Sequence, residues 1–224
     1  MSSTAAHSRS RSTSTSPMSA QLLALYRHAQ EHAHAHGRQP AGAQPCTVLQ
    51  LGADHTIVAS GADPQQPAVV VTLALGYDRT ARDFFRGAVP TPLELETAIA
   101  SVEDEIHAAH RLQRDHPVQG TLYAQALADG APPPWSMDPG LHELATLAGI
   151  PPGVVRPLPL DAMERLFNRL ASVSEGRPAA HEGLPESSPF AARLLVLREL
   201  MHHMPFAAIT LVDGASLSSS AISV

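Results

Sequence analysis

Histidines and carboxylates stand three and four residues apart in the segment 103–110, and these side chains are the best suited to chemistry. Glu103 and His107 are four positions apart, and His107 and His110 are three apart. On a helix both spacings place side chains on one face, where they can meet one ion or exchange a proton. The pattern predicts Glu103 and His107 as catalytic residues, and His107 and His110 as metal ligands. Di-iron bundles use a Glu and a His three residues apart and repeat that unit on a second helix; because no clear second copy is evident, a solvated acidic helix face is the alternative.

A second candidate site follows the most apolar run of the chain. Gly76 leaves this run and leads into a short segment that contains Arg79, Arg82 and Arg86. Where a strand ends and a helix begins, free N–H groups and the helix dipole favour anions. Guanidinium groups can also bind a carboxylate or phosphate through two hydrogen bonds. The junction 76–86 is therefore predicted to bind a small anionic molecule. Glu94 or Glu103 of the next helix would be its acid–base partner. The alternative is that each arginine pairs with an acid of its own helix.

The N-terminal part of the chain carries a further histidine group. His28, His32 and His36 recur at four-residue spacing and would share one face of a helix. Imidazoles at this spacing can bind a borderline metal ion such as zinc or nickel. An exposed helix end, where protonated histidine suits the dipole, is the alternative.

Several catalytic motifs are excluded by the residues that they lack. All fifteen basic residues are arginine, which excludes a lysine-containing phosphate loop, a Schiff-base enzyme and a lysine general base. His142 and Glu143 begin the zinc-protease pattern, but Thr146 stands where the second histidine is required. Cys46 is the one cysteine, so neither an intrachain disulfide nor a cysteine zinc cage can form. The sequence assigns no cofactor.

Charge and hydropathy narrow the classes of partner. The net charge is −6, and an acidic surface repels a phosphate backbone, so no nucleic acid is expected as a partner. No apolar run approaches the roughly 18 residues of a membrane helix. We therefore expect no membrane association and a cytoplasmic location. The lysine-free, histidine-rich composition is typical of a protein from a GC-rich bacterial genome.

The elements that must position these residues are predicted from apolar periodicity and turn signals. They indicate an α+β or α/β fold, with a small mixed sheet, packed helices and a mainly helical C-terminal half. Strands are expected near 46–51, 55–60, 68–75 and 206–212. The run 68–75 is apolar almost throughout, so we expect it mid-sheet with both faces covered. Helices are expected over 17–36, 77–87 and 91–116, and beginning at 138, 161 and 188.

Five helix starts carry capping signals, among them Ser16 before Pro17 and Asp138 before Pro139. Thr91, Pro92 and Glu94 predict a capping box at the start of the longest helix. Asp161 and Glu164 predict a second box, and Ser188 is the expected cap of the last helix. The segment 120–130 fits a helix or an edge strand equally well.

Composition divides the chain into a body and two tails. Residues 1–16 are rich in Ser and Arg with little to bury, which predicts a disordered tail. Residues 17–212 are expected to form a single compact domain, and the Pro-rich breaks near 131–151 leave a subdivision open. A flexible tail is expected over 213–224.

These features together predict a globular protein that binds or acts on a small anionic ligand at the junction 76–86. Two alternatives remain. One is a non-catalytic interaction module that forms a homo-oligomer through its helical half. The other is a metal-dependent enzyme that uses the side chains of 103–110. The sequence leaves open whether the protein is an enzyme.

Overall fold

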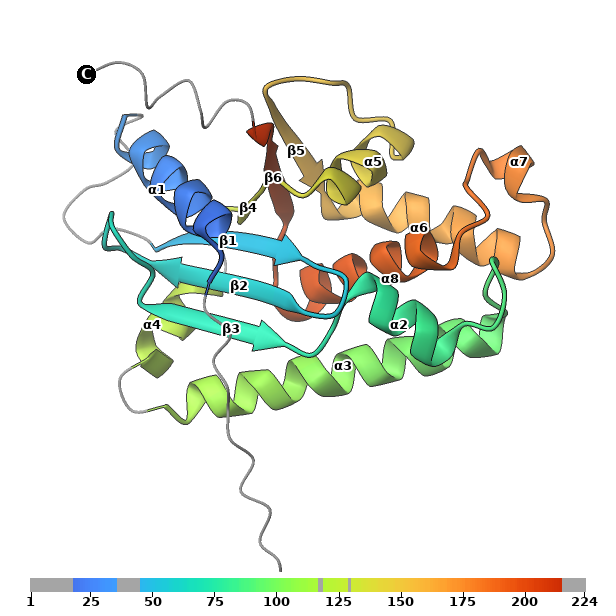
Figure 1. Cartoon of the computed structure of the whole chain (residues 1–224), viewed down its shortest axis with the longest axis horizontal. Helices are drawn as coiled ribbons and strands as arrows, with labels where there is room; N and C mark the ends of the chain where they lie inside the picture. Colours follow the sequence, from blue (N-terminus) through green and yellow to red (C-terminus); the bar gives the residue numbers. More distant parts are fainter. Residues whose placement is uncertain (1–17, 36–44, 117–118, 129, 215–224) are drawn as a thin grey trace, which may run out of the picture.

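A computed structural model describes residues 18–35, 45–116, 119–128 and 130–214. The predicted tail 1–16 and most of the predicted tail 213–224 lie outside these residues. Within them, a twisted sheet has helices on both faces (Figure 1). Helix α1 (Ala20–Ala35) packs on one face against β1, and α3 and α4 pack on the other against β2 and β3. No helix in the described ranges is long and apolar enough to cross a membrane.

The sheet is mixed and has six strands, which confirms the predicted fold class. In chain order these are β1 (Cys46–Leu51), β2 (Thr56–Gly61), β3 (Val69–Leu73), β4 (Trp135–Ser136), β5 (Val155–Pro159) and β6 (Ala208–Val212). Their order across the sheet is β3-β2-β1-β4-β6-β5. Strands β1, β4 and β6 are parallel neighbours, whereas β2, β3 and β5 run antiparallel to the strands they pair with.

The four predicted strands are confirmed as β1, β2, β3 and β6, but the position of the third is wrong. The apolar run 68–75 forms an edge strand rather than a central one. Val69, Val71 and Leu73 face the main core, and Val70 packs partly against the smaller core under α1. Helices α3 and α4 pack against β3, and Val70 and Thr72 of its other face are only partly buried, so the apolar run does not require a strand on each side.

Two strands were missed because they lie in Pro-rich segments. Strand β4 is two residues long, and β5 contains Pro157 and Pro159. Proline cannot donate a hydrogen bond to a sheet ladder, so it is tolerated at an edge. Strand β5 lies at an edge and pairs with β6 alone.

The remaining helices follow the predicted order. They are α2 (Tyr77–Phe84), α3 (Pro92–Arg114), α4 (Gln119–Ala126), α5 (Pro139–Leu147), α6 (Leu160–Ser174), α7 (Ala179–Glu182) and α8 (Ser188–His203). Helix α4 resolves the ambiguity of the segment 120–130 in favour of a helix. The long helix α3 buries one stripe of apolar residues, namely Leu95, Ala98, Val102 and Ile106.

Of the predicted caps, the box of Thr91 and the Asp138 cap of α5 are confirmed, and Ser16 lies outside the described residues. At the start of α3 the Glu94 side chain accepts a hydrogen bond from the Thr91 N–H (2.8 Å), and Thr91 Oγ1 accepts one from the Glu94 N–H (3.3 Å). The box at Asp161 is wrong, because α6 already begins at Leu160 and has no side-chain cap. The cap of α8 is Ser187, one residue before the predicted position.

The β1–β2 turn docks on the start of α2 and closes one corner of the fold. The N–H of Tyr77 donates to the Gly52 carbonyl (3.1 Å), and those of Asp78 and Arg79 donate to the Ala53 carbonyl (3.0 and 3.1 Å). A Cβ on Gly76 would lie 2.2 Å from the Ala53 carbonyl oxygen. Glycine is therefore required at position 76 by the close approach of two backbone segments.

We predict that Gly76→Ala lowers the free energy of unfolding by about 1–3 kcal/mol, because the new methyl group separates the turn from α2. Urea denaturation monitored by circular dichroism measures this change. Gly87→Ala is the matched control, since its Cβ would lie 3.5 Å from the Val89 carbonyl oxygen in ordinary contact. That variant should change stability by no more than about 0.5 kcal/mol. Equal stability of the two variants would contradict the docking role of Gly76.

Candidate functional site

A groove of about 460 Å³ lies at the carboxyl ends of the parallel strands. Strands β1, β4 and β6 end side by side, and the residues that follow them form its walls together with parts of α1 and α2. Open sheets with parallel strands commonly bind ligands at this edge. The polar residues and glycines that line it are Gln21, Gln50, Gly52, Tyr77, Ser136, Asp138 and Gly214.

Asp138 is the carboxylate of this groove, and it also caps α5. Its Oδ1 accepts a hydrogen bond from the Gly140 N–H (2.8 Å), and Pro139 takes the first helical position. Burial raises the pKa of the Asp138 carboxyl, although the N–H groups of Gly140 and Leu141 and the charge of Arg193 oppose the rise. A carboxyl group that titrates closer to neutral pH can accept or donate a proton, and its charged form can hold a cation.

Arg193 lies behind the groove, against the start of α5. Its guanidinium stacks on the Tyr77 ring at 4.1 Å and reaches Glu143 at 3.5 Å. The Arg193 Nε is buried and has no hydrogen-bond acceptor among the described residues. Arg193 does not line the groove, but its positive charge acts on the Asp138 carboxyl.

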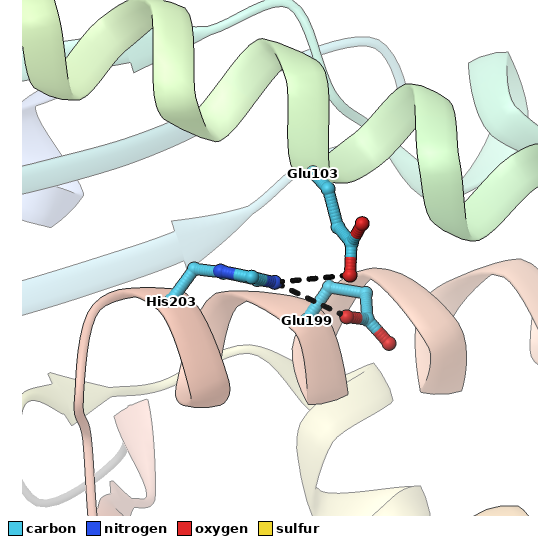
Figure 2. A group of neighbouring side chains, drawn as sticks. All are labelled: Glu103, Glu199 and His203. Carbon is cyan, nitrogen blue, oxygen red and sulfur yellow. Dashed lines mark hydrogen bonds and ion pairs between the residues drawn. The ribbon is translucent and has the colours of Figure 1, made fainter.

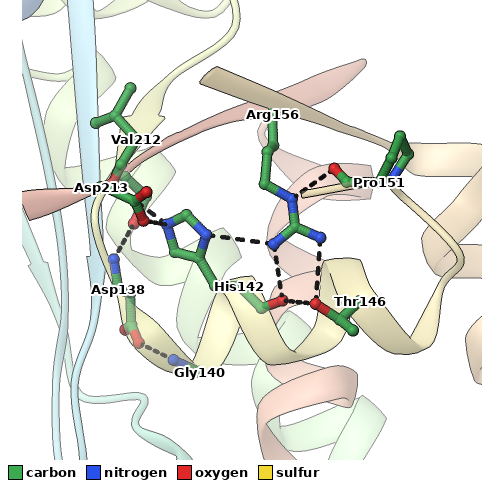
Figure 3. Close-up of polar contacts among 9 residues, drawn as sticks. Asp138, Gly140, His142, Thr146, Pro151, Arg156, Val212 and Asp213 are labelled. Atoms are coloured by element: carbon green, nitrogen blue, oxygen red, sulfur yellow. Dashed lines mark hydrogen bonds and ion pairs between the residues drawn. The ribbon is translucent and has the colours of Figure 1, made fainter. Parts of the chain in front are cut away.

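The other end of α5 is fixed by Arg156, a buried residue of β5 (Figure 3). Its guanidinium donates to the carbonyls of Ile150 (2.7 Å), Pro151 (3.0 Å) and His142 (3.3 Å), and to Thr146 Oγ1 (3.2 Å). These bonds join β5 to α5 and to the segment that follows α5. Thr146, which stands where the zinc-protease pattern requires a second histidine, therefore has a structural role as a partner of Arg156.

His142 connects α5 to β6 beside the groove. Its Nε2 lies 3.2 Å from the Val212 carbonyl oxygen and 4.0 Å from Asp213 Oδ1 (Figure 3). Asp138 at one end, Arg156 at the other and His142 between them hold α5 in place. The Asp138 carboxyl is therefore positioned by a helix that is fixed along its length.

The arginines predicted to bind an anion are not brought together. Arg79 pairs with Asp83 (3.7 Å), Arg82 pairs with Asp54 (3.1 Å), and the fully exposed Arg86 lies 4.0 Å from Glu94. The N–H groups at the start of α2 are occupied by the β1–β2 turn. Anion binding by Gly76, Arg79, Arg82 and Arg86 stays a prediction.

The residues predicted for metal binding and catalysis are separated by the structure into two groups. Glu103 Oε1 lies 3.2 Å from His203 Nε2, and the ring of His107 lies 5.0 Å from that of His203. His110 instead packs its ring against Tyr123 at 5.6 Å, and burial lowers the pKa of the His110 imidazole. The roles predicted for Glu103, His107 and His110 are not tested by these positions.

Sequence reasoning missed Glu199 and Asp138. A signal for Glu199 was present, because Glu199 and His203 repeat on α8 the four-residue spacing of Glu103 and His107 on α3. Asp138 was recognised as a cap, but its place in a groove depends on the pairing of β1 with β4.

The remaining candidates, the histidines of α1 and Cys46, do not line the groove. The rings of His28 and His32 pack edge-on against Trp135 at 6.0 and 4.9 Å, and His36 lies outside the described residues. Cys46 is buried, and burial raises the pKa of its thiol to about 12. A thiol with this pKa remains protonated near neutral pH, which disfavours a nucleophilic role.

We predict that Asp138→Asn becomes progressively more stable relative to the wild type as the pH rises from 4 to 7. Because burial raises the pKa of Asp138 in the folded protein, its contribution to stability is present below its unfolded pKa of about 3.9 and is lost as the pH rises through the folded value. Asparagine has no carboxyl group to titrate and still caps a helix. Urea denaturation of both proteins across this pH range measures the effect.

Asp138→Ala is the control for the cap. It removes the acceptor of the Gly140 N–H and should be less stable than Asp138→Asn by about 1 kcal/mol at every pH. Parallel pH profiles of the wild type and Asp138→Asn would contradict the raised pKa.

Solved structures of phosphatases share this fold. The Aquifex aeolicus member of the Ppx/GppA protein family superposes with a TM-score of 0.61 at 13% sequence identity, over 90% of this chain and 62% of that one. An exopolyphosphatase from Cytophaga hutchinsonii gives a TM-score of 0.58 at 11% identity, over 89% of this chain and 64% of that one. An exopolyphosphatase-like protein gives 0.57 at 12% identity, over 90% and 66%.

The likeness concerns the fold. No protein-family model matches the sequence, and no curated protein matches it either. This chain spans 62–66% of the length of the structures named above. It shares with them the arrangement of sheet and helices that creates the groove-bearing edge.

Proposed function

We propose that this protein binds a phosphoanhydride, such as an inorganic polyphosphate or a nucleoside polyphosphate, in the groove at the ends of β1, β4 and β6, and hydrolyses its terminal phosphate. The observation that carries the proposal is the half-buried carboxyl of Asp138 in this groove, in a fold that is similar to that of Ppx/GppA phosphatases. The groove volume of about 460 Å³ is in the range of small-molecule sites.

Charge determines the form in which such a ligand would bind. None of the described residues that line the groove carries a positive side chain, and Asp138 adds a negative one. A polyphosphate would be repelled unless a divalent cation came with it. Magnesium is commonly held by one or two carboxylates together with substrate phosphates, so Asp138 and Gln50 supply suitable oxygen atoms.

The reaction would be the addition of water to the terminal phosphorus. The bond from phosphorus to the bridging oxygen breaks, and inorganic phosphate leaves together with the shortened chain. In its charged form, one oxygen of Asp138 would hold the cation and the other would accept a proton from the attacking water. Homo-oligomer formation and a cytoplasmic location stay predictions.

We predict that tripolyphosphate binds in the presence of magnesium chloride, and that Asp138→Asn weakens this binding about tenfold or more, as expected for the loss of a charged contact. Isothermal titration calorimetry measures the affinity, and release of inorganic phosphate measures hydrolysis. Asp138→Asn is suitable because it preserves the cap of α5.

The double variant Arg79→Ala/Arg82→Ala is the control, and it also tests the site predicted at 76–86. It should bind magnesium tripolyphosphate as the wild type does. If the arginine variant loses binding and Asp138→Asn retains it, the ligand binds at 76–86 and the groove proposal is wrong. Absence of binding to both tripolyphosphate and ATP with magnesium would overturn the proposed function as a whole.

A further inference from the structure

Two helices that are far apart in the sequence bring a matching pair of side chains to one place. Helices α3 and α8 pack against each other, and each carries a glutamate followed four residues later by a histidine. Glu103 and His107 lie on α3, and Glu199 and His203 lie on α8. The four-residue spacing differs from the three-residue spacing of the di-iron unit, but it repeats on both helices.

We propose that Glu103, Glu199 and His203 form a binding site for a divalent transition-metal ion, with zinc as the preferred ion and His107 as the fourth side chain within reach. One oxygen or nitrogen of each of the three residues lies within 4.8 Å of the others. Figure 2 shows Glu103 reaching from α3 toward the His203 imidazole, beside Glu199 on α8. The proposal does not depend on the function proposed for the groove.

The distances suit a tetrahedral ion. His203 Nε2 lies 3.2 Å from Glu103 Oε1 and 3.6 Å from Glu199 Oε2. Zinc bonds to nitrogen and oxygen of 2.0–2.2 Å in a tetrahedron place neighbouring ligand atoms about 3.3 Å apart. A single ring nitrogen carries at most one proton, yet here it faces two carboxylate oxygens. A cation between the three atoms would satisfy all of them.

The charge balance of the cluster also favours a cation. Glu199 is buried, and its Oε1 is bound by Arg198, which leaves Oε2 directed at His203. The same guanidinium is shared with Glu164, whose carboxylate also meets His202. Arg198 therefore neutralises only part of the charge on three neighbouring carboxylates, those of Glu103, Glu164 and Glu199. A divalent ion would offset the remainder.

His107 can complete the coordination. Its ring stands 5.0 Å from that of His203 at an interplanar angle of 75°, and its side chain is exposed, so it is free to change rotamer. Two imidazoles and two carboxylates suit zinc, whereas magnesium and calcium prefer oxygen ligands throughout. Bound metal would tie α3 to α8.

The test uses the full chain without an affinity tag, stripped of metal by chelation and then dialysed. Zinc affinity is measured by calorimetry, and cobalt(II) replaces zinc to report tetrahedral coordination by visible absorption. The variants are His203→Asn and Glu103→Gln, of which the second changes a partly exposed side chain and should leave folding intact. We expect each to weaken zinc binding at this site about tenfold or more.

Two controls separate this site from other histidines. His202→Asn removes the neighbouring imidazole, which contacts Glu164 instead, and His28→Asn/His32→Asn removes the pair beside Trp135. Both controls should retain the cobalt absorption and the tight zinc site. Unchanged zinc affinity in both His203→Asn and Glu103→Gln would overturn the proposal. So would loss of the tight site in His28→Asn/His32→Asn, or equal binding of magnesium and zinc.

Discussion

Helix α8 is enclosed on almost every side, and the surrounding helices are arranged to cover it. The consecutive residues Leu194, Leu195, Val196 and Leu197 are all buried. A helix that is apolar around its whole circumference must lie inside the protein, and α2, α3 and α6 each pack against it. Truncating one of these leucines to alanine would lower the free energy of unfolding by about 2–5 kcal/mol. Because α8 leads into β6, the same burial fixes the strand that joins β4 to β5 (Figure 1).

The burial of α8 also explains the polar chemistry that collects along it. Glu199 lies on a largely buried helix, and desolvation raises the pKa of its carboxyl. A buried charge is stable only when it is paired, and Arg198 and His203 supply the partners from the same helix. Glu103 of α3 also contacts the His203 imidazole. The cluster thus follows from the need to compensate one carboxylate within the core.

The groove depends on a different constraint, the parallel pairing of β1, β4 and β6. Three of the segments that line it, namely 49–52, 136–139 and 214, lie far apart in the chain and stand at the ends of these strands. They meet because the carboxyl ends of parallel neighbours lie at the same edge of a sheet. Two prolines suit their positions in this region. Pro139 begins α5, and Pro157 lies in the edge strand β5, where it discourages pairing with a strand of another molecule.

Most of the element types follow from local sequence patterns. Caps, apolar periodicity and glycine positions act over a few residues, so the capping box of Thr91 and Glu94 and the strand Cys46–Leu51 could be predicted directly. Local patterns do not specify that the run 68–75 lies at an edge, that Trp135 and Ser136 join the sheet, or which side chains meet. Strand pairing and desolvation act between residues far apart in the chain, as for Glu103 and His203. Their partners are therefore set by packing of the whole fold and not by local pattern.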